Sequence, residues 1–369
     1  MSDEPIYVTQ PWLPPLEEFM PYLQQIWHSR ILTNRGPFYR QFEQALCDFL
    51  QVEHVALCAN GTIALSTALH AAGLEGEVIT SPYSFPATAH VLANSNLTPV
   101  FADIDPMTFC LDAATIEPAI TPRTAAIMPV HVYGNTCDTR SIKAVADKGN
   151  LRVIYDAAHA FGVQDDAGSV LKHGDFSALS FHATKVFNTF EGGAIVCADR
   201  QTKELVDKLN NFGIADETTV VAAGLNGKMD EFKASLGLLQ LKHFEQLVSR
   251  RKMIDASYRE QLGDIPGITL MQRDGRQVSN FSYFPILVEP GYPLDRDSLY
   301  EKLKSRGIFS RRYFYPLISN LPMYRNLPSA DPANLPVANA ISNKVLCLPI
   351  YSALSDEQVE KVVGVLKCH

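Results

Sequence analysis

Ser180-Phe181-His182-Ala183-Thr184-Lys185, followed by Glu191-Gly192-Gly193, is the stretch that most strongly indicates how this chain folds. The largely apolar residues from Asp175 to Phe181 predict a strand that delivers Lys185 into a turn. A second apolar run, Ala194 to Ala198, leaves from the glycine pair and predicts another strand. The sequence therefore places a lone lysine in a small, polar, glycine-flanked turn between two strands.

A carboxylate is expected at the end of a neighbouring strand. The run Val153-Ile154-Tyr155 ends in Asp156, 185 − 156 = 29 residues before the lysine. An amine and a carboxylate at neighbouring strand ends suit pyridoxal phosphate, because the amine forms an imine with its aldehyde and the carboxylate keeps its pyridine nitrogen protonated. Taken singly, Lys185 is more often a surface lysine, and Asp156 is equally a helix cap before Ala157.

Composition and charge exclude several classes of protein. A chain of 369 residues is too long for one compact core and suggests two domains of unequal size. The net charge of −8 argues against a nucleic-acid surface, and no apolar stretch reaches membrane-spanning length. The seven cysteines are scattered without a Cys-x-x-Cys pair, which is typical of reduced intracellular thiols rather than of disulfides or a metal site. We therefore expect a cytoplasmic protein with no nucleic-acid, membrane or metal partner.

Short apolar runs alternate with helix-like segments between about residues 50 and 200. The runs span residues 54–58, 77–80, 98–103, 124–130, 152–156, 178–181 and 193–198. This alternation predicts an α/β layer structure with a mostly parallel sheet, whose ligands lie beyond the carboxyl ends of the strands. A long helical pattern follows Asp230 and leads to a second domain. There we expect strands near 268–271 and 282–287, a helix over 296–306 and a final helix opened by a Ser355/Gln358 capping box.

Three further segments carry candidate cofactor contacts. Gly61 and Thr62 begin an Ala/Leu-rich helix, where free amides and a hydroxyl could bind a phosphate, although Asn60 and Thr62 also suit a plain N-cap. Phe85 follows a strand and could cover the face of a flat cofactor, or lie in the core as most Phe residues do. Asn226, in a glycine-bracketed turn, is either a turn residue or a polar ligand contact.

Together these segments resemble the DegT/StrS-type sugar aminotransferase family of fold-type-I pyridoxal-phosphate enzymes, which make amino sugars from nucleotide-linked keto sugars. The resemblance spans nearly the whole chain, from residues 33–37 through 129–134 to 347–350. Its strongest block is 180–193, which is similar to the family's Ser-Phe-His-x-Thr-Lys and Glu-Gly-Gly frame at identical spacing. The resemblance implies a large cofactor-binding α/β domain over residues 1–245 and a small C-terminal α+β domain over residues 246–369.

The resemblance also implies roles for individual residues. Lys185 would carry the imine and Asp156 would pair with the pyridine nitrogen. The other implied cofactor contacts are Gly61, Thr62 and Ser180 to the phosphate, Phe85 to the ring face and His159 near the ring hydroxyl. Asn226 matches an asparagine that reaches the cofactor phosphate of the other subunit, which implies a homodimer with shared active sites.

The implied activity is a transamination in two half-reactions. L-Glutamate would give up its amino group and leave as 2-oxoglutarate, and the resulting pyridoxamine phosphate would aminate the keto carbon of a nucleotide-linked sugar. The Phe-His-x-Thr-Lys form is commoner in branches that act at C4, so we favour dTDP-4-keto-6-deoxyglucose becoming dTDP-4-amino-4,6-dideoxyglucose. Amination at C3, a UDP or GDP carrier, another pyridoxal enzyme such as a lyase, and a non-catalytic regulatory or binding protein are the alternatives.

The substrate pocket is less well defined by the sequence. Arg311, Arg312 and Tyr313 form a basic and aromatic cluster that could face a diphosphate and a nucleotide base. A solvated loop with two surface arginines explains the same cluster equally well. Phe190 stands where many relatives have glycine, and it could narrow the turn after the lysine and reshape the sugar pocket.

Overall fold

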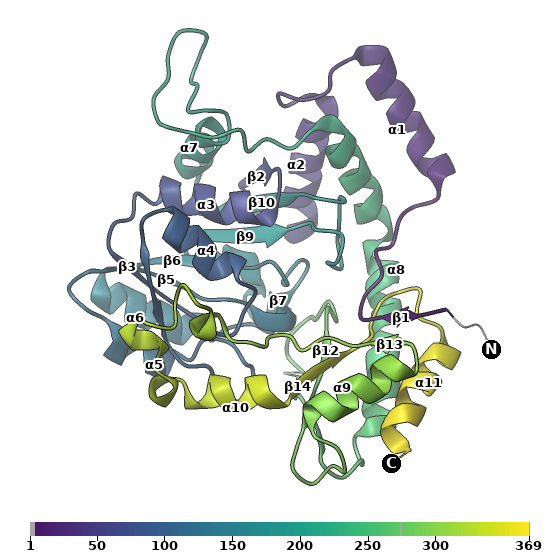
Figure 1. Ribbon diagram of the computed structural model, residues 1–369. Coiled ribbons are helices and arrows are strands. Elements are labelled where there is room, and N and C mark those ends of the chain that lie inside the picture. Colours follow the sequence, from purple (N-terminus) through teal and green to yellow (C-terminus); the bar gives the residue numbers. More distant parts are fainter. Residues whose placement is uncertain (1–3, 274, 369) are drawn as a thin grey trace.

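The computed structural model describes residues 4–273 and 275–368. A seven-stranded sheet of order β2-β10-β9-β6-β5-β3-β4 forms the centre of its larger part (Figure 1). The strands are β2 (Val55–Cys58), β3 (Glu77–Thr80), β4 (Thr98–Phe101), β5 (Thr124–Met128), β6 (Arg152–Asp156), β9 (Phe176–Ser180) and β10 (Gly193–Cys197). Among them β10 runs antiparallel to both of its neighbours, and the other pairs are parallel. Every apolar run singled out above is therefore a strand of one sheet, and the α/β prediction is confirmed.

Helices cover both faces of this sheet. One face carries α3 (Gly61–Ala71), α4 (Ala87–Asn94) and α7 (Arg200–Leu209), and the other carries α2 (Pro37–Leu50), α6 (Thr139–Gly149) and the start of α8 (Glu231–Leu262). Ile154 of β6 joins the apolar cluster on the α3 face, whereas Val153 and Tyr155 join the cluster on the other face. Successive side chains of a strand point to opposite faces of the sheet, and here both faces are buried. The side chains on both faces are therefore mostly apolar, and the strands appear in the sequence as continuous apolar runs.

A smaller C-terminal part is built on an antiparallel sheet of order β11-β12-β14. Its elements are β11 (Ile268–Leu270), β12 (Phe284–Val288), α9 (Arg296–Ser305), β13 (Ile308–Phe309), α10 (Pro336–Lys344), β14 (Val345–Leu348) and α11 (Asp356–Lys367). The Ser355 side chain and the Gln358 side chain each bond the other's backbone amide, so the predicted capping box opens α11.

Helix α8 joins the two parts. Asp230 caps it by accepting the Lys233 amide, and Phe244 belongs to the core of the larger part. Ile254 and Tyr258, further along, belong to the core of the smaller part. The expected domain boundary near residue 245 therefore falls inside a continuous helix.

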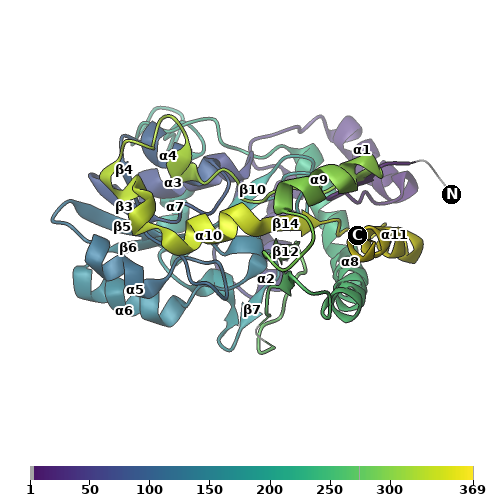
Figure 2. The same ribbon diagram turned by 60° about the horizontal axis from the view of Figure 1, so that its bottom comes forward.

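Two segments pack on the part of the molecule that is distant from them in sequence. The N-terminal strand β1 (Ile6–Tyr7) pairs in parallel with β13, so the first described residues pack against the smaller C-terminal part. Residues 311–335 return over the large sheet, where the Ile318 amide donates to the Pro82 carbonyl at 3.0 Å. The chain then enters α10, which runs directly into β14 (Figure 2). This return places residues near 313 beside the carboxyl edge of the large sheet.

The remaining elements are peripheral: α1 (Leu16–Ser29), α5 (Ala113–Ile116), β7 (Gln164–Asp165) and β8 (Gly168–Ser169). Across residues 4–273 and 275–368, no helix combines the length and the apolar character needed to cross a membrane.

Candidate active site

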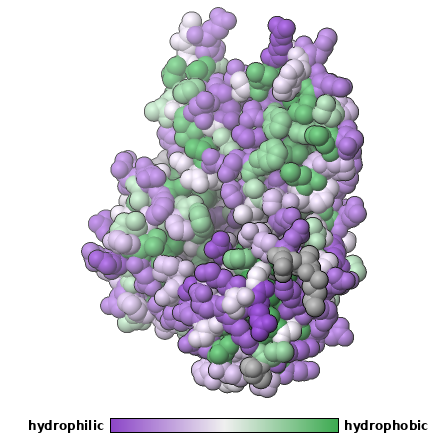
Figure 3. Space-filling model, turned by 45° about the vertical axis from the view of Figure 1, so that its right-hand side comes forward, coloured by the Kyte–Doolittle hydropathy of each residue, from purple (hydrophilic) through white to green (hydrophobic). Residues whose placement is uncertain are grey.

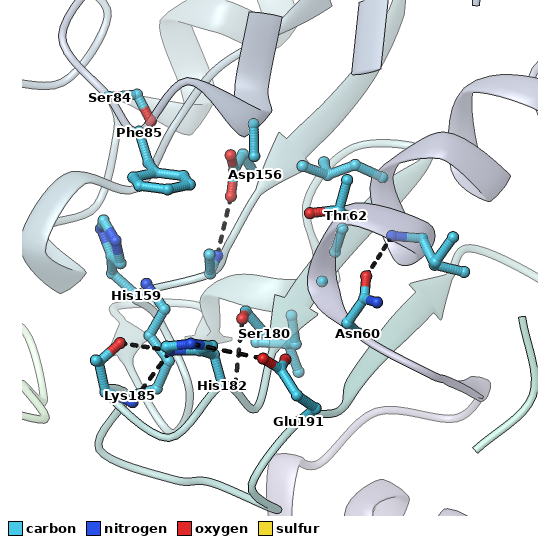
Figure 4. A pocket seen from close by; sticks show the side chains of 18 of the residues that line it. Asn60, Thr62, Ser84, Phe85, Asp156, His159, Ser180, His182, Lys185 and Glu191 are labelled. Atoms are coloured by element: carbon cyan, nitrogen blue, oxygen red, sulfur yellow. Dashed lines mark hydrogen bonds and ion pairs between the residues drawn. The ribbon is translucent and has the colours of Figure 1, made fainter. Parts of the chain in front are cut away.

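A cavity of about 490 Å³ lies at the carboxyl ends of β6 and β9, beside the start of α3. Strands β6 and β9 are parallel neighbours, with Asp156 opposite Ala178, so both strands end at the same edge of the sheet. Figure 4 shows side chains from separate segments converging on this space. The predicted cofactor contacts that line it are Gly61, Thr62, Phe85, Asp156, His159, Ser180 and Lys185.

The Asp156 carboxylate is buried and held at both oxygens. Its Oδ2 accepts the Thr88 hydroxyl at 2.8 Å, and its Oδ1 accepts the Ala158 amide at 3.1 Å. Burial raises the pKa of this carboxyl, whereas the Thr88 and Ala158 hydrogen bonds and the charge of Lys185 act to lower it. No helix follows at Ala157, so the carboxylate is not a helix cap and is available to a ligand in the cavity.

Lys185 lies in the turn that the sequence predicted. The turn is closed by its amide, which donates to the His182 carbonyl at 2.8 Å. Gly192 is required in the return to β10, because a Cβ there would lie 2.1 Å from the Thr189 hydroxyl oxygen. Burial lowers the pKa of the Lys185 amine to about 8, although Asp156 acts to raise it. About a tenth of this amine is therefore neutral, and so nucleophilic, at pH 7, far more than for a lysine of ordinary pKa.

An anion cradle is formed where α3 begins against the end of β9. Asn60 caps the helix by accepting the Ile63 amide, and in the described chain no hydrogen bond is donated by the amides of Gly61 and Thr62. A Cβ at position 61 would lie 2.7 Å from the Ser180 Cβ, so only glycine allows this approach. Two free amides at a helix N-terminus, with two hydroxyls beside them, suit a phosphate.

His159 is a buried imidazole in a defined tautomer. Its Nδ1 accepts the Tyr133 backbone N–H at 3.2 Å, so the proton of the neutral ring resides on Nε2. Burial, with the charge of Lys185, lowers the pKa of His159 well below its ordinary value and keeps the ring neutral. The ring is parallel to Phe314 at 6.0 Å and meets the edge of Tyr283 at 4.9 Å. His159 can therefore offer one N–H donor to a ligand in the cavity.

Phe85 is an exposed aromatic residue at the rim of the cavity, with 59% of its surface exposed. Figure 4 shows its ring on the side of the cavity occupied by Asp156 and His159, away from Asn60. Such exposure is unusual for Phe and excludes the alternative that it is a core side chain. It leaves an apolar face available to a flat ligand.

Some predicted residues lie outside the cavity. Asn226 is exposed in its turn, where its backbone bridges Asn211. Arg312 pairs with Asp297 at 2.7 Å and does not line the cavity, and neither does Arg311. Of that cluster, Tyr313 alone lines the cavity among the described residues. Phe190 stacks on Phe232 at 5.8 Å, also outside the cavity.

The structure adds residues that the sequence did not indicate. Tyr283 and Phe314 line the cavity from the C-terminal part. His182 and Glu191, from the block that contains Lys185, also line it and face each other at 3.6 Å. Thr88 lies behind Asp156 on α4. A signal for Thr88 was present, because it lies in the first turn of a helix that follows the end of β3. Tyr283 and Phe314 had no local signal, since only the folding of the second part brings them here.

Comparison with known proteins places this site in context. The DegT/DnrJ/EryC1/StrS aminotransferase family matches residues 16–367. A dTDP-4-amino-4,6-dideoxy-D-glucose transaminase of Shigella dysenteriae is 55% identical over 365 residues, which are 99% of each chain. A crystal structure of DesI in the presence of its TDP-sugar product has a TM-score of 0.94 at 37% identity, covering 99% of this chain and 93% of that one. The PMP form of Spr1654 from Streptococcus pneumoniae has a TM-score of 0.91 at 25% identity and covers 98% of each chain.

Proposed function

The chain belongs to the DegT/DnrJ/EryC1/StrS aminotransferase family and is a nucleotide-sugar transaminase, and we propose that it aminates C4 of dTDP-4-keto-6-deoxyglucose with L-glutamate as amino donor. The product would be dTDP-4-amino-4,6-dideoxyglucose. The observation that carries the proposal is that Lys185 and Asp156 line one cavity, because a non-catalytic protein on this scaffold would need neither. The similarity of 55% over the whole chain to a transaminase of that dTDP-sugar supports C4 and the dTDP carrier over the alternatives.

Pyridoxal phosphate fits the donor set of the cavity. Lys185 would attach its aldehyde, Asp156 would pair with its ring nitrogen, and the α3 cradle of Gly61, Thr62 and Ser180 would take its phosphate. When bound, this cofactor supplies an electron sink for the carbon that gains or loses the amino group. The cavity therefore contains residues suited to the aldehyde, the ring nitrogen and the phosphate of pyridoxal phosphate.

The protein's own groups supply the proton chemistry. Because burial lowers the pKa of Lys185 to about 8, its Nζ can both accept and return a proton near neutral pH, which suits a general acid–base. The Asp156 carboxylate is anchored by two donors and would stabilise a cationic ring nitrogen. The neutral His159 ring would donate its Nε2 proton in a hydrogen bond to the oxygen of the hydroxyl group on the cofactor's pyridine ring. Phe85 would cover one face of the ring and reduce the access of water.

The surface supports a homodimer with shared active sites. Apolar side chains gather over α1 in the upper part of the face seen in Figure 3. Large exposed apolar side chains include Leu16 and Trp27 of α1, Leu32 after it and Phe190, which stacks on Phe232 beside Phe19 of α1, and Val220 is exposed in the loop that leads to Asn226. Exposed apolar groups in such number mark protein–protein contacts. We expect Asn226, which is exposed in one of these loops, to reach the partner's cofactor phosphate.

The dimer can be tested by mixing inactive subunits. Lys185→Ala and Asn226→Ala chains should each be inactive alone and should recover part of the activity when mixed, because one site of the heterodimer has both residues intact. No recovery from a mixture proved dimeric by light scattering would contradict a shared site.

The activity is tested with the purified protein, pyridoxal phosphate, L-glutamate and the dTDP-linked keto sugar. We expect L-glutamate to shift the absorbance of the bound cofactor with release of 2-oxoglutarate, and the sugar to gain an amino group at C4 by mass spectrometry and NMR. UDP-linked and GDP-linked 4-keto sugars serve as controls for the carrier. A protein that binds the cofactor but converts none of these sugars would refute the proposed reaction.

A further inference from the structure

Two buried hydroxyls lie in a row behind the Asp156 carboxylate. Thr88, on α4, is fully buried, and its Oγ1 lies 2.8 Å from Asp156 Oδ2. Ser84 is 3% exposed, and its Oγ lies 2.9 Å from the Thr88 Oγ1. Ser84 also lines the active-site cavity, whereas Thr88 does not. The three groups form a chain that begins at the cavity, passes through the protein and ends on the carboxylate.

The direction of this chain follows from counting protons. An ionised carboxylate only accepts hydrogen bonds, so Thr88 must donate its single hydroxyl proton to Asp156. The Thr88 oxygen then has only acceptor positions left, so Ser84 must donate to Thr88. Each donated bond polarises the next hydroxyl, and the row therefore acts as one donor aimed at the carboxylate.

Asp156 needs this support because of where it lies. It is 5% exposed, and burial without compensation would favour its neutral form. The titratable groups that face it are Lys185, Tyr283 and the neutral His159, and Lys185 is the only cationic one of these three. Within the described residues, the protein's hydrogen-bond donors to this carboxylate are the Thr88 hydroxyl and the Ala158 amide, and attachment of Lys185 to a cofactor would leave both in place.

We infer that Thr88, supported by Ser84, is a positioning residue that holds the Asp156 carboxylate ionised and in one orientation towards the ring nitrogen of the cofactor. The inference rests on the proposed cofactor site. The segment that leads into α4 places two residues on opposite sides of its surface. Phe85, just before the helix, is exposed at the rim of the cavity, and Thr88, in the first turn of the helix, is buried against Asp156. Oδ1 is fixed by the Ala158 amide and Oδ2 by Thr88, so the carboxylate cannot rotate without losing a bond.

The test compares variants of a single hydroxyl. Thr88→Val keeps the shape and removes the donor, and Thr88→Ser restores the donor. Thr80→Val is the matched control, because Thr80 is also fully buried with its hydroxyl on a main-chain oxygen, that of Met128 at 2.7 Å, and it does not line the cavity. The dissociation constant of pyridoxal phosphate is measured on the apoproteins by fluorescence quenching between pH 5.5 and 8.5, and thermal melting of each apoprotein reports its folding.

We expect Thr88→Val to bind the cofactor on the order of tenfold more weakly at neutral pH, because a hydrogen bond that holds the carboxylate towards the ring nitrogen is lost. The acid limb of the binding profile should move to higher pH, because a carboxylate without its donor takes up a proton more readily. Thr88→Ser and Thr80→Val should bind within about twofold of the wild type with an unmoved profile. A merely structural role would lower the melting temperature without moving the acid limb.

Unchanged binding and an unchanged pH profile in folded Thr88→Val would overturn the inference. If that variant does not fold, Ser84→Ala decides: a weaker affinity and an acid limb at higher pH support the inference, and no change in either refutes it. Failure of the wild-type protein to bind pyridoxal phosphate would refute the proposed function instead, so the two failures are distinguishable.

Discussion

The two edges of the large sheet each carry a cavity, and they differ in how their charges are matched. The cavity at the carboxyl edge holds Lys185 and Asp156 in about 490 Å³. A larger cavity, of about 620 Å³, lies at the amino edge of the same strands β6 and β9, lined by Arg152, Asp175 and residues of α6. Judged by volume alone, this cavity would be the better candidate for the functional site.

Four of the charged side chains at the amino edge form two ion pairs. Lys143 contacts Asp147 at 2.6 Å on the surface of α6, and Arg152 contacts Asp175 at 2.6 Å. At the carboxyl edge the Lys185 amine has no ion pair among the described residues, and burial lowers its pKa to about 8. Groups that are desolvated and left available to a ligand mark a functional site better than volume does. Substituting residues of the same type at the two edges tests whether the carboxyl edge alone carries the function.

The largest difference is expected between lysines. Lys185→Ala should lower turnover on the order of 10³-fold or more, because in the proposed mechanism one amine both attaches the cofactor and acts as the general base. Lys143→Ala, at the amino edge, should retain full turnover, since its surface ion pair contributes at most about 1 kcal/mol to stability. Steady-state kinetics on both variants measure this. Equal effects of the two substitutions would remove the distinction between the edges.

The next difference is expected between aspartates. Asp156→Ala should lower kcat/KM on the order of 10²-fold, because the protonated ring nitrogen of the proposed cofactor would lose its buried anionic partner, at a cost of about 3 kcal/mol or more. Asp175 accepts the Val153 amide at 2.8 Å besides pairing with Arg152, so Asp175→Ala should destabilise the fold by about 1 kcal/mol with kcat/KM unchanged. Kinetics and urea unfolding separate the two results. A catalytic defect in Asp175→Ala would show that the amino edge also takes part in the reaction.

Substitution of a glycine at each edge should affect different properties: cofactor affinity at the carboxyl edge and stability of the fold at the amino edge. Gly61→Ala would bring a Cβ to 2.7 Å from the Ser180 Cβ, and we expect about tenfold weaker binding of pyridoxal phosphate. Gly174, at the amino edge, has a φ of +75°, and a Cβ there would lie 2.8 Å from the Val153 carbonyl oxygen. Gly174→Ala should therefore cost about 1–2 kcal/mol of stability without changing cofactor affinity. Loss of affinity in Gly174→Ala rather than Gly61→Ala would reverse the assignment of the cradle.

The smallest effect is a pH dependence. Lysine attacks an aldehyde as the neutral amine, so the rate of cofactor attachment to the apoprotein should rise with pH as Lys185 loses its proton. For a pKa of about 8, the neutral fraction grows from about 10% at pH 7 to about 90% at pH 9, roughly a ninefold increase that then levels off. An ordinary lysine of pKa about 10.4 would still be gaining rate above pH 9. Stopped-flow absorbance between pH 6.5 and 10 distinguishes the two, and a rate that keeps rising would contradict a lowered pKa.

The sequence predicted the strands and their ends because these signals are local. Each buried strand is a continuous apolar run, so its end could be found within a residue or two, and Asp156 and Ser180 are indeed the last residues of β6 and β9. Gly61 and Asn60 begin a helix whose cap is encoded in neighbouring positions. Parallel strands must end at a common edge, so the meeting of Lys185 with Asp156 could also be expected.

The boundary between the two parts was harder to place. Helix α8 continues through residue 245 because its apolar residues change partners, from the large core to the small one, without a break in the helical pattern. A sequence pattern records that a residue is buried but not which core buries it. The pairing of β1 with β13 was invisible for the same reason, since strands of two residues carry no pattern of their own.

By itself, then, the sequence determined the layered sheet, the lysine turn, the acidic strand end and the glycine at the start of α3, because each depends on residues adjacent in the chain. The tertiary structure alone decided that Phe85 is exposed, that Thr88 supports Asp156 and that Tyr283 and Phe314 close the cavity. These contacts join residues from tens to more than two hundred positions apart, and their geometry is fixed only when separate elements pack together.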